Sequence, residues 1–428
     1  MGTDHRINAV MVAALLGTVL LGGCSHGSYE KITAAETTVQ QAENADKGEQ
    51  NSAEERIGQA DAETGIILET EAEHAGENSP MDGVQAENSD DADASDDAAD
   101  SDNSGPSDDS DAVGDSMTIL FSGDVLLSDH VLNAYSRAGG ISGVLDQGYL
   151  SAIQSADYFA VNEEFPFSSR GTQAADKQYT FRLAPEKVSM FQEMGIDAVT
   201  LANNHALDYG TDALLDTCDV LDGAGILHTG AGKNLDEAKQ PVVFEKNGQR
   251  VALIGATRVI PQADWAATNS HPGMLSSYEV SVEPLLNQIA ECHAAGDKVV
   301  VLIHWGIERD ETPQEYQRAL AKRYIDAGAD LVIGSHPHVL QGMEYYKGKP
   351  IFYSLGNFVF GSSIPKTMLV QAEFQEDNLE LKLIPGTSSG GYTRTLTDAG
   401  EKTQFYQYLE GISFGVSVDA DGTVSPQP

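Results

Sequence analysis

The sequence predicts an α/β domain with a mixed sheet at the end of a long acidic segment. From Met117 onward, short apolar runs alternate with helical segments and hairpins then follow, a pattern typical of an α/β domain. The composition changes sharply before that point. Between Gly27 and Ser116 there are 26 acidic and 3 basic residues, and Tyr29 is the only aromatic residue. This stretch has too little apolar surface to offset the entropy of ordering, so we predict a disordered linker.

The first 24 residues predict an exported lipoprotein. Ala9–Leu21 is an apolar run of 13 residues, which is too short to span a bilayer and is typical of a signal peptide. Gly22 and Gly23 then precede Cys24, a pattern that resembles a bacterial lipoprotein signal. We therefore expect lipid on Cys24 and a location on the outer face of the cell membrane. An ordinary secretory signal with an incidental cysteine is the alternative.

The chain thus divides into a signal peptide over residues 1–24, an acidic linker over 25–116 and a globular domain over 117–428. The globular part holds 39 acidic and 21 basic residues, and the whole chain has a formal charge of −41. Both parts repel a phosphate backbone, which excludes nucleic acid as a partner. Cys218 and Cys292 form no disulfide framework, and Cys218 is expected to be a small buried hydrophobe.

Local patterns predict the first elements of the globular part. The apolar run after Met117 ends in Gly-Asp and predicts a strand that leads into a loop. Tyr158–Val161 predicts a second strand, followed by the polar residues 162–164. Pro185–Met194 predicts a helix, because proline suits the first turn and Gly195 can end it.

The next segment, residues 196–210, runs from a strand into a polar loop, and Thr211–Leu221 predicts an amphipathic helix closed by Gly223 and Gly225. Two hairpins are predicted further on, because Asn-Gly and Lys-Gly pairs at 247–248 and 347–348 separate apolar runs. The segments between these hairpins are a buried strand at Lys298–His304, a helix at Gln314–Ala327 and a strand over 329–338 that ends in histidines.

Five of the predicted strands end in polar side chains that can bind a ligand. These residues are Asp124, Glu164, Asn204 with His205, His304, and His336 with His338. In open α/β sheets, ligands bind in the crevice beyond the carboxyl ends of the strands. One such ending is commonplace, whereas five in one domain predict a shared site.

The residue types at these strand ends predict a metal site. Histidine, carboxylate and amide ligands suit a divalent transition metal such as Mn, Fe or Zn. The predicted ligands are Asp124, Glu164, Asn204, His304, His336 and His338. One or two metal ions there would polarise a phosphoryl oxygen and supply a metal-bound hydroxide near neutral pH.

Other side chains are predicted to act beside the metal. His205 would donate a proton to a leaving group, and Asp208 is spaced to orient it. Asn162 and Arg182 are the predicted substrate contacts, since Arg182 is a cation in an acidic chain. A salt bridge at the start of a helix is the alternative role for Arg182.

The predicted ligands also have simpler interpretations. A Gly-Asp pair after a strand is usually a turn, which would make Asp124 structural. His304 could be a satisfied core histidine, and Trp305 is expected to pack rather than to stack on a substrate. Glu163 and Glu164 offer two choices of ligand, and both ionise only if a cation relieves their repulsion.

The order of the motifs resembles a known family. Seven motifs carry the resemblance: GDVLL from Gly123, NEEFP from Asn162, YTFR from Tyr179, ANNHALDYG from Ala202, HWGIE from His304, GSHPHVLQG from Gly334 and YSLGNFVF from Tyr353. Together, over residues 118–361, they are similar to the CapA family, the capsule and poly-γ-glutamate synthesis group within the calcineurin-like metallophosphoesterase superfamily.

The resemblance implies a metallophosphoesterase-like αββα sandwich with its site at the strand ends. It implies ligand roles for the six predicted metal ligands and proton donation by His205. The family's usual Asn-Leu-Glu is Asn162-Glu163-Glu164 here, so Glu164 is the matching carboxylate.

One motif of the wider superfamily is absent. Its Asp-x-His is replaced here by Asp124 followed by Val125 and Leu126. A bridging Asp in a Gly-Asp pair is also missing, and Glu164 is the residue that could replace it. One metal position is therefore expected to be poorer or empty, and the resemblance does not imply phosphoesterase activity.

Three functions fit these observations. The first is a surface lipoprotein in capsule or poly-γ-glutamate biosynthesis, export or anchoring, acting through a metallophosphoesterase-like site. Its expected partners are the anionic capsule polymer or its precursor, the membrane through the lipid anchor, and membrane synthase subunits. The second is a metal-dependent extracellular phosphoesterase or other hydrolase, and the third is a non-catalytic scaffold that binds the polymer.

Overall fold

The computed structural model describes residues 116–175 and 177–427. The predicted signal peptide with Cys24 and nearly all of the predicted linker lie outside these described residues. Of the described helices, none has the length and apolar character needed to cross a membrane.

The larger of two main sheets has eight strands. In spatial order they are β16 (Tyr392–Thr395), β15 (Leu379–Ser389), β14 (Ser363–Phe374), β1 (Met117–Val125), β2 (Tyr158–Glu163), β3 (Ala198–Thr200) and β4 (Leu227–Thr229), with β13 (Asn357–Val359) beside the end of β1. The strands from β1 to β4 are parallel, whereas β14, β15 and β16 are antiparallel. The sheet is therefore mixed, as predicted.

The smaller main sheet has six strands. In spatial order they are β11 (Leu340–Tyr346), β12 (Lys349–Leu355), β10 (Leu331–Ser335), β9 (Lys298–His304), β7 (Gln249–Thr257) and β6 (Val242–Lys246). The four central strands are parallel, and an antiparallel hairpin forms each edge. Both hairpins turn where the sequence predicted. The two turn residues of each hairpin take the left-handed conformation that a type I′ turn needs: Asn247 (φ 52°) with Gly248 (φ 81°), and Lys347 (φ 52°) with Gly348 (φ 74°).

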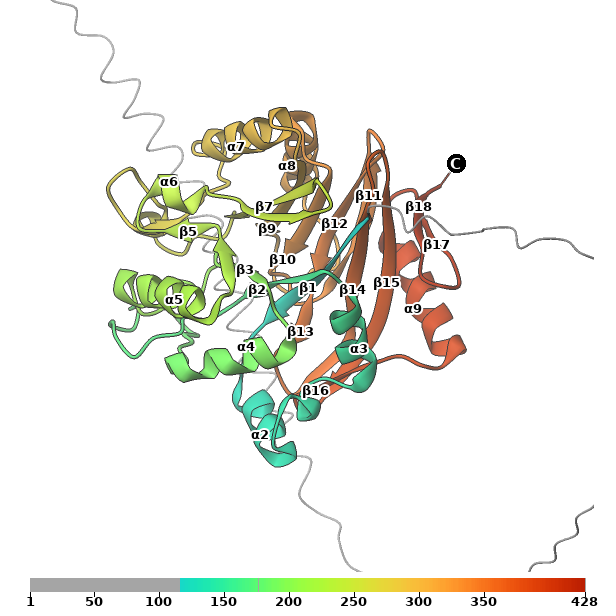
Figure 1. Cartoon of the computed structure of the whole chain (residues 1–428), viewed down its shortest axis with the longest axis horizontal. Coiled ribbons are helices and arrows are strands. Elements are labelled where there is room, and N and C mark those ends of the chain that lie inside the picture. Colours follow the sequence, from blue (N-terminus) through green and yellow to red (C-terminus); the bar gives the residue numbers. More distant parts are fainter. Residues whose placement is uncertain (1–115, 176, 428) are drawn as a thin grey trace, which may run out of the picture. The chain divides into compact units, whose positions relative to one another are not determined.

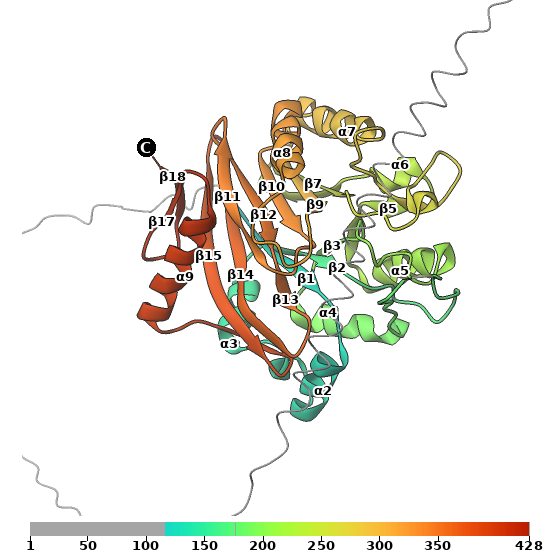
Figure 2. The same cartoon turned by 180° about the vertical axis from the view of Figure 1, so that it is seen from behind.

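The two sheets face each other across a common apolar core. Phe121 from the larger sheet and Leu302 and Ile333 from the smaller sheet belong to this inner layer. The outer face of the larger sheet packs on α2 (Asp129–Ala138), α3 (Gln147–Ser155), α4 (Val188–Met194) and α5 (Thr211–Ala224). The outer face of the smaller sheet packs on α7 (Glu283–Ala294) and α8 (Glu315–Ala327) (Figure 1 and Figure 2). This is the predicted αββα sandwich.

Shorter elements complete the described part. They are η1 (Ile141–Gly143), η2 (Pro185–Lys187), β5 (Ala231–Gly232), α6 (Leu235–Ala238), η3 (Ala263–Trp265), β8 (Gly273–Met274), α9 (Ala399–Ile412), β17 (Val416–Val418) and β18 (Val424–Pro426). Phe405 and Leu409 of α9 pack into the core between the sheets, so this C-terminal helix closes one side of the sandwich.

The predicted helices form, with small changes at their ends. The helix expected over Pro185–Met194 begins as the single 3-10 turn η2 and continues as α4. The helix expected to end at Leu221 runs three residues further and includes Gly223. It ends only where Gly225 (φ 76°) takes the left-handed conformation that caps a helix. Cys218 lies on the buried face of α5 as a free thiol, which confirms its predicted packing role.

Candidate metal centre

The polar strand ends of both sheets converge on one buried cluster. Asp124 comes from β1, Glu164 directly follows β2, and His304 ends β9 of the other sheet. These three side chains are at most 1% exposed, and one ligand atom from each lies within 4.8 Å of the others. Because parallel strands present their carboxyl ends at the same edge, packing the two sheets brings these ends together.

Asn162 holds the cluster together from its centre. Its Nδ2 donates to Asp124 Oδ1 at 2.8 Å and to Glu164 Oε1 at 3.2 Å, and it lies 3.3 Å from His304 Nδ1. Its Oδ1 accepts a hydrogen bond of 3.1 Å from Asn203 Nδ2. Asn162, a predicted substrate contact, is therefore buried among the predicted ligands and fixes two of their carboxylates.

The histidines complete the cluster from the second sheet. His304 Nε2 lies 2.8 Å from Asn204 Oδ1, 3.6 Å from Glu164 Oε1 and 3.1 Å from His336 Nδ1. His338 Nδ1 lies 3.3 Å from Asp124 Oδ2. All six predicted metal ligands are thus brought together by direct contacts.

Two of these histidines have a strained backbone. His336 (φ 99°) and His338 (φ 57°) are among the few described non-glycine residues with positive φ, and Pro337 separates them. A non-glycine residue in this region costs on the order of 1–3 kcal/mol and persists only where its surroundings enforce it. The loop after β10 therefore has a strained backbone that lowers the stability of the fold and directs both rings into the cluster.

Burial sets the charge state of the cluster. The pKa of Glu164 is raised well above its usual value by burial and by the neighbouring charge of Asp124. The pKa values of His304 and His336 are lowered by burial and by the other histidines, so both rings are neutral. Burial also lowers the pKa of His338, but the charges of Glu164 and Asp124 outweigh it and raise that pKa to about 10.

The donor set fits a divalent metal ion. Two carboxylates, three imidazoles and an amide oxygen are the ligand types that suit such an ion, and a nearby cation would favour the ionised form of Glu164. Glu164 Oε2 is buried and has no hydrogen-bond partner among the described residues, which leaves one oxygen free to coordinate.

The predicted proton donor lies beside the cluster with its own support. His205 is the neighbour of Asn204 in the chain, and its Nδ1 lies 2.8 Å from Asp208 Oδ2. Asp208 also accepts the Phe181 N–H at 2.7 Å, which fixes the carboxylate in the orienting position predicted for it. Burial lowers the pKa of His205 to about 4, so its ring is neutral near pH 7.

Lys177 is a site residue that the sequence analysis missed. Its Nζ donates to Asn204 O at 2.5 Å and to Asp208 Oδ1, and it lies 3.0 Å from His205 Nδ1. Lys177 lies in an irregular loop 28 residues before His205, so spacing gave no signal for it. Asn203 was missed although it stands inside ANNH, and its Oδ1 accepts the His205 N–H at 3.0 Å.

The two neighbouring glutamates at the end of β2 have different surroundings. Glu164 joins the cluster, whereas the Glu163 carboxylate is fully buried with neither oxygen hydrogen-bonded to a described residue. The pKa of the Cys218 thiol on α5 is raised to about 12, mainly because the thiol is buried and secondly because of the charge of Glu163. Successive side chains of an extended chain point to opposite sides, so only one of the pair can reach the buried cluster.

Arg182 lies outside the cluster. Its Nη1 donates to Arg170 O at 2.9 Å, and its guanidinium stacks on the Tyr209 ring at 3.9 Å. Arg182 forms no ion pair with a described residue, so a backbone carbonyl and an aromatic ring take the place of the salt bridge considered as its alternative role. Its role as a substrate contact stays a prediction.

The fold and the cluster define a class: an αββα sandwich with a buried carboxylate, histidine and amide centre at the strand ends. The family model of the bacterial capsule synthesis protein PGA_cap matches residues 118–362, and the chain belongs to this family. The CapA family predicted from the motifs is thereby confirmed.

Curated relatives agree with this assignment. A capsule biosynthesis protein CapA from Bacillus anthracis is 35% identical over 298 residues, which is 67% of this chain and 71% of that protein. A PGA biosynthesis protein CapA from Bacillus subtilis (strain 168) is 36% identical over 247 residues, 57% of this chain and 63% of that protein.

A solved NAD nucleotidase from Haemophilus influenzae is 12% identical over 70% of this chain and 57% of that chain, with a TM-score of 0.39.

Proposed function

We propose that this chain is an accessory protein in the synthesis of a capsular poly-γ-glutamate or related acidic polymer. Its membership of the capsule synthesis family supports this role, as do the names of its two CapA relatives. The chain spans 71% of the first relative and less than two thirds of the second. The observation that carries the chemical part of the proposal is the buried group of Asp124, Glu164 and His304.

The cluster would hold one or two divalent ions, with Mn, Fe and Zn as the ions that suit its donors. Asp124, Glu164 and His304 form the core of the site, and Asn204, His336 and His338 lie within contact of that core. A bound ion would supply Lewis acidity toward an anionic group of the polymer or its precursor. The position of the missing Asp-x-His histidine is taken by Leu126, which is buried in the core, so the second ion would have fewer ligands.

The residues beside the cluster have roles of their own in this proposal. Lys177 supplies a positive charge next to His205, and Asp208 fixes the ring of His205. An anionic group bound near His205 would raise its pKa from about 4 and allow the ring to hold a proton for a leaving group.

The proposal includes export and anchoring. Cys24 would carry the lipid, and the acidic segment over residues 25–116 would hold the globular part away from the outer face of the membrane. The partners proposed are the acidic polymer or its precursor, the membrane, and membrane synthase subunits.

Gene replacement tests this function. A strain without the gene would be complemented with the wild-type chain or with Glu164→Gln, which keeps the size of the side chain but removes its charge. We expect the wild type, and not the variant, to restore the amount and attachment of the polymer. Unchanged polymer in the deletion strain would contradict the proposal.

A second candidate function is a metal-dependent phosphoesterase or hydrolase. The dyad of His205 and Asp208 next to the cluster favours it, because a leaving group needs a proton donor. The discriminating result is turnover of phosphate esters that is lost in His205→Gln with metal content retained. Polymer restoration by His205→Gln without any turnover would favour the third function, a non-catalytic scaffold.

A further inference from the structure

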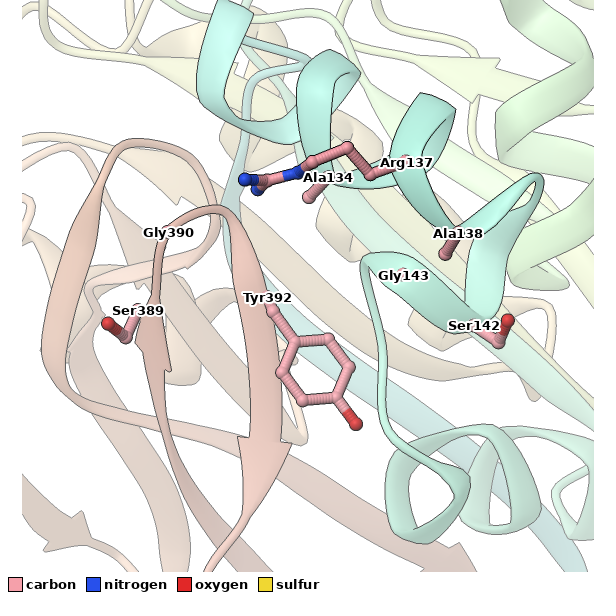
Figure 3. A pocket seen from close by; sticks show the side chains of 8 residues that line it. All are labelled: Ala134, Arg137, Ala138, Ser142, Gly143, Ser389, Gly390 and Tyr392. Carbon is pink, nitrogen blue, oxygen red and sulfur yellow. The ribbon is translucent and has the colours of Figure 1, made fainter. Parts of the chain in front are cut away.

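A hollow of about 370 Å³ lies on the larger sheet's side of the molecule, outside the metal cluster. It opens between the end of α2 with η1 and the turn from β15 to β16 (Figure 3). Its lining residues are Ala134, Arg137, Ala138, Ser142, Gly143, Ser389, Gly390 and Tyr392. None of these residues belongs to the cluster, so the hollow is a separate feature.

Backbone contacts hold the two walls of the hollow in place. The Thr393 N–H donates to Val144 O at 2.7 Å, and the Asp146 N–H donates to Thr393 O at 3.0 Å. The turn also lies close to α2, because a Cβ added at Gly391 would come within 2.4 Å of His130 O. The hollow is therefore formed before any ligand arrives, which lowers the cost of binding.

Polar groups around the hollow lack partners. Arg137, Ser142, Ser389 and Tyr392 have side chains with no hydrogen bond or ion pair to another described residue. Of the 21 lysines and arginines in the described part, twelve pair with carboxylates, and Arg137 is one of the nine that do not. Figure 3 shows the guanidinium of Arg137 extended toward the turn that carries Ser389.

The composition of the lining selects an anion that also carries apolar groups. No acidic residue lines the hollow, although acidic residues outnumber basic ones by 39 to 21 over residues 117–428. An exposed arginine without a carboxylate partner presents its planar fork to a carboxylate. Tyr392, which is 37% exposed, adds an aromatic face against which methylene groups can pack.

We propose that this hollow binds the carboxylates of an acidic polymer chain, with Arg137 as the charged partner and Tyr392 as the apolar one. The inference rests on the proposed function and names its ligand as a γ-linked glutamate chain, whose repeating unit combines a carboxylate with two methylene groups. The long-range field of this acidic protein repels such a chain, but screening limits that repulsion to about 8 Å at physiological salt. A local cation without a carboxylate partner is then the place where the polymer can dock.

Polymer binding by variants of the full chain tests this site. The probe is fluorescein-labelled poly-γ-glutamate, and its anisotropy is read at about 0.15 M NaCl, where screening confines the repulsion to short range. We expect Arg137→Gln to weaken binding at least about fivefold. Arg394→Gln is the matched control, because it removes the same charge from the exposed face of β16 without touching the hollow. Thermal melts would check that both variants fold.

A variant of the metal cluster separates this inference from the proposed function. His336→Ala with His338→Ala removes two predicted ligands and is expected to retain polymer binding, because the hollow is left intact. Equal binding by the Arg137 and Arg394 variants would overturn the inference. The inference would also be overturned if binding is lost in the histidine variant and kept in Arg137→Gln. That result would support contact between the polymer and the metal cluster instead. Absence of binding by the wild type would also overturn it, while the gene replacement would still test the proposed function.

Discussion

Replacing Glu163 by leucine is predicted to stabilise the protein. The carboxylate is fully buried outside the cluster of predicted metal ligands, and neither oxygen has a hydrogen-bond partner among the described residues. A buried polar group without a partner costs about 1–3 kcal/mol, and a leucine of similar size removes that cost. The resulting rise in Tm is about 2–6 °C for a domain of this size.

The dependence on pH sharpens this prediction. Burial raises the pKa of Glu163 well above its usual value, so the folded chain keeps a proton that the unfolded chain releases above about pH 4.3. The stability of the wild type therefore falls as the pH rises above that value toward the folded pKa. The advantage of Glu163→Leu is expected to be larger at pH 8 than at pH 5.

Urea unfolding at pH 5 and pH 8 measures both effects. Glu163→Gln is the control, because it removes the ionisation but leaves an unpaired polar amide in the same place. It should match the wild type at pH 5 and exceed it at pH 8, while Glu163→Leu exceeds the wild type at both. A leucine variant less stable than the wild type at pH 8 would refute the reasoning, provided that its metal content is unchanged.

Three further predictions follow from other buried groups. Lys177→Met should destabilise the fold by about 3 kcal/mol in urea unfolding, because it leaves the buried Asp208 without its cation. It should also raise the pKa of His205 measured by NMR, because the ammonium of Lys177 lowers that pKa; an unchanged pKa would contradict the proximity of the ammonium. Glu344→Gln should cost about 1–3 kcal/mol at pH 7, and the cost should shrink as the pH falls below about 4.3, because burial raises the pKa of that carboxyl but its hydrogen bonds to Arg318, Tyr353 and Lys322 outweigh burial and lower the pKa. A cost that is the same at pH 7 and pH 3.5 would exclude these charged contacts as its cause. Alkylation of Cys218 by iodoacetamide at pH 8 should be slow until urea unfolds the chain, because burial raises the pKa of its thiol to about 12. Rapid labelling of the folded chain would count against the burial of Cys218.

The strand ends were predictable because their physical signal is local. A buried parallel strand is a continuous apolar run, so its end is visible where polar residues begin, as at His304 and in the two histidines after β10. Period-two alternation also assigns Glu163 and Glu164 to opposite faces of their strand. It does not say which side meets the second sheet, and only the resemblance to the family motif selects Glu164 over Glu163.

Other parts of the site depend on contacts between distant segments. Lys177 reaches His205 and Asp208 from an irregular loop that carries no periodic pattern. Asn357 reaches His338 Nδ1 at 2.8 Å only because β13 pairs with the end of β1. The hollow beside Arg137 is formed by segments about 250 residues apart, and its small and polar lining residues form no motif. The long strands β14 and β15 and the helix α9 were likewise not predicted, although they complete the larger sheet and the inner core.

Elemental analysis of the purified chain tests whether the buried cluster binds a metal ion. The wild type and the variant with His336→Ala and His338→Ala would be compared after identical reconstitution with Mn, Fe or Zn. We expect near-stoichiometric metal in the wild type and little in a variant that still folds. Absence of metal from both, or equal metal in both, would contradict this expectation.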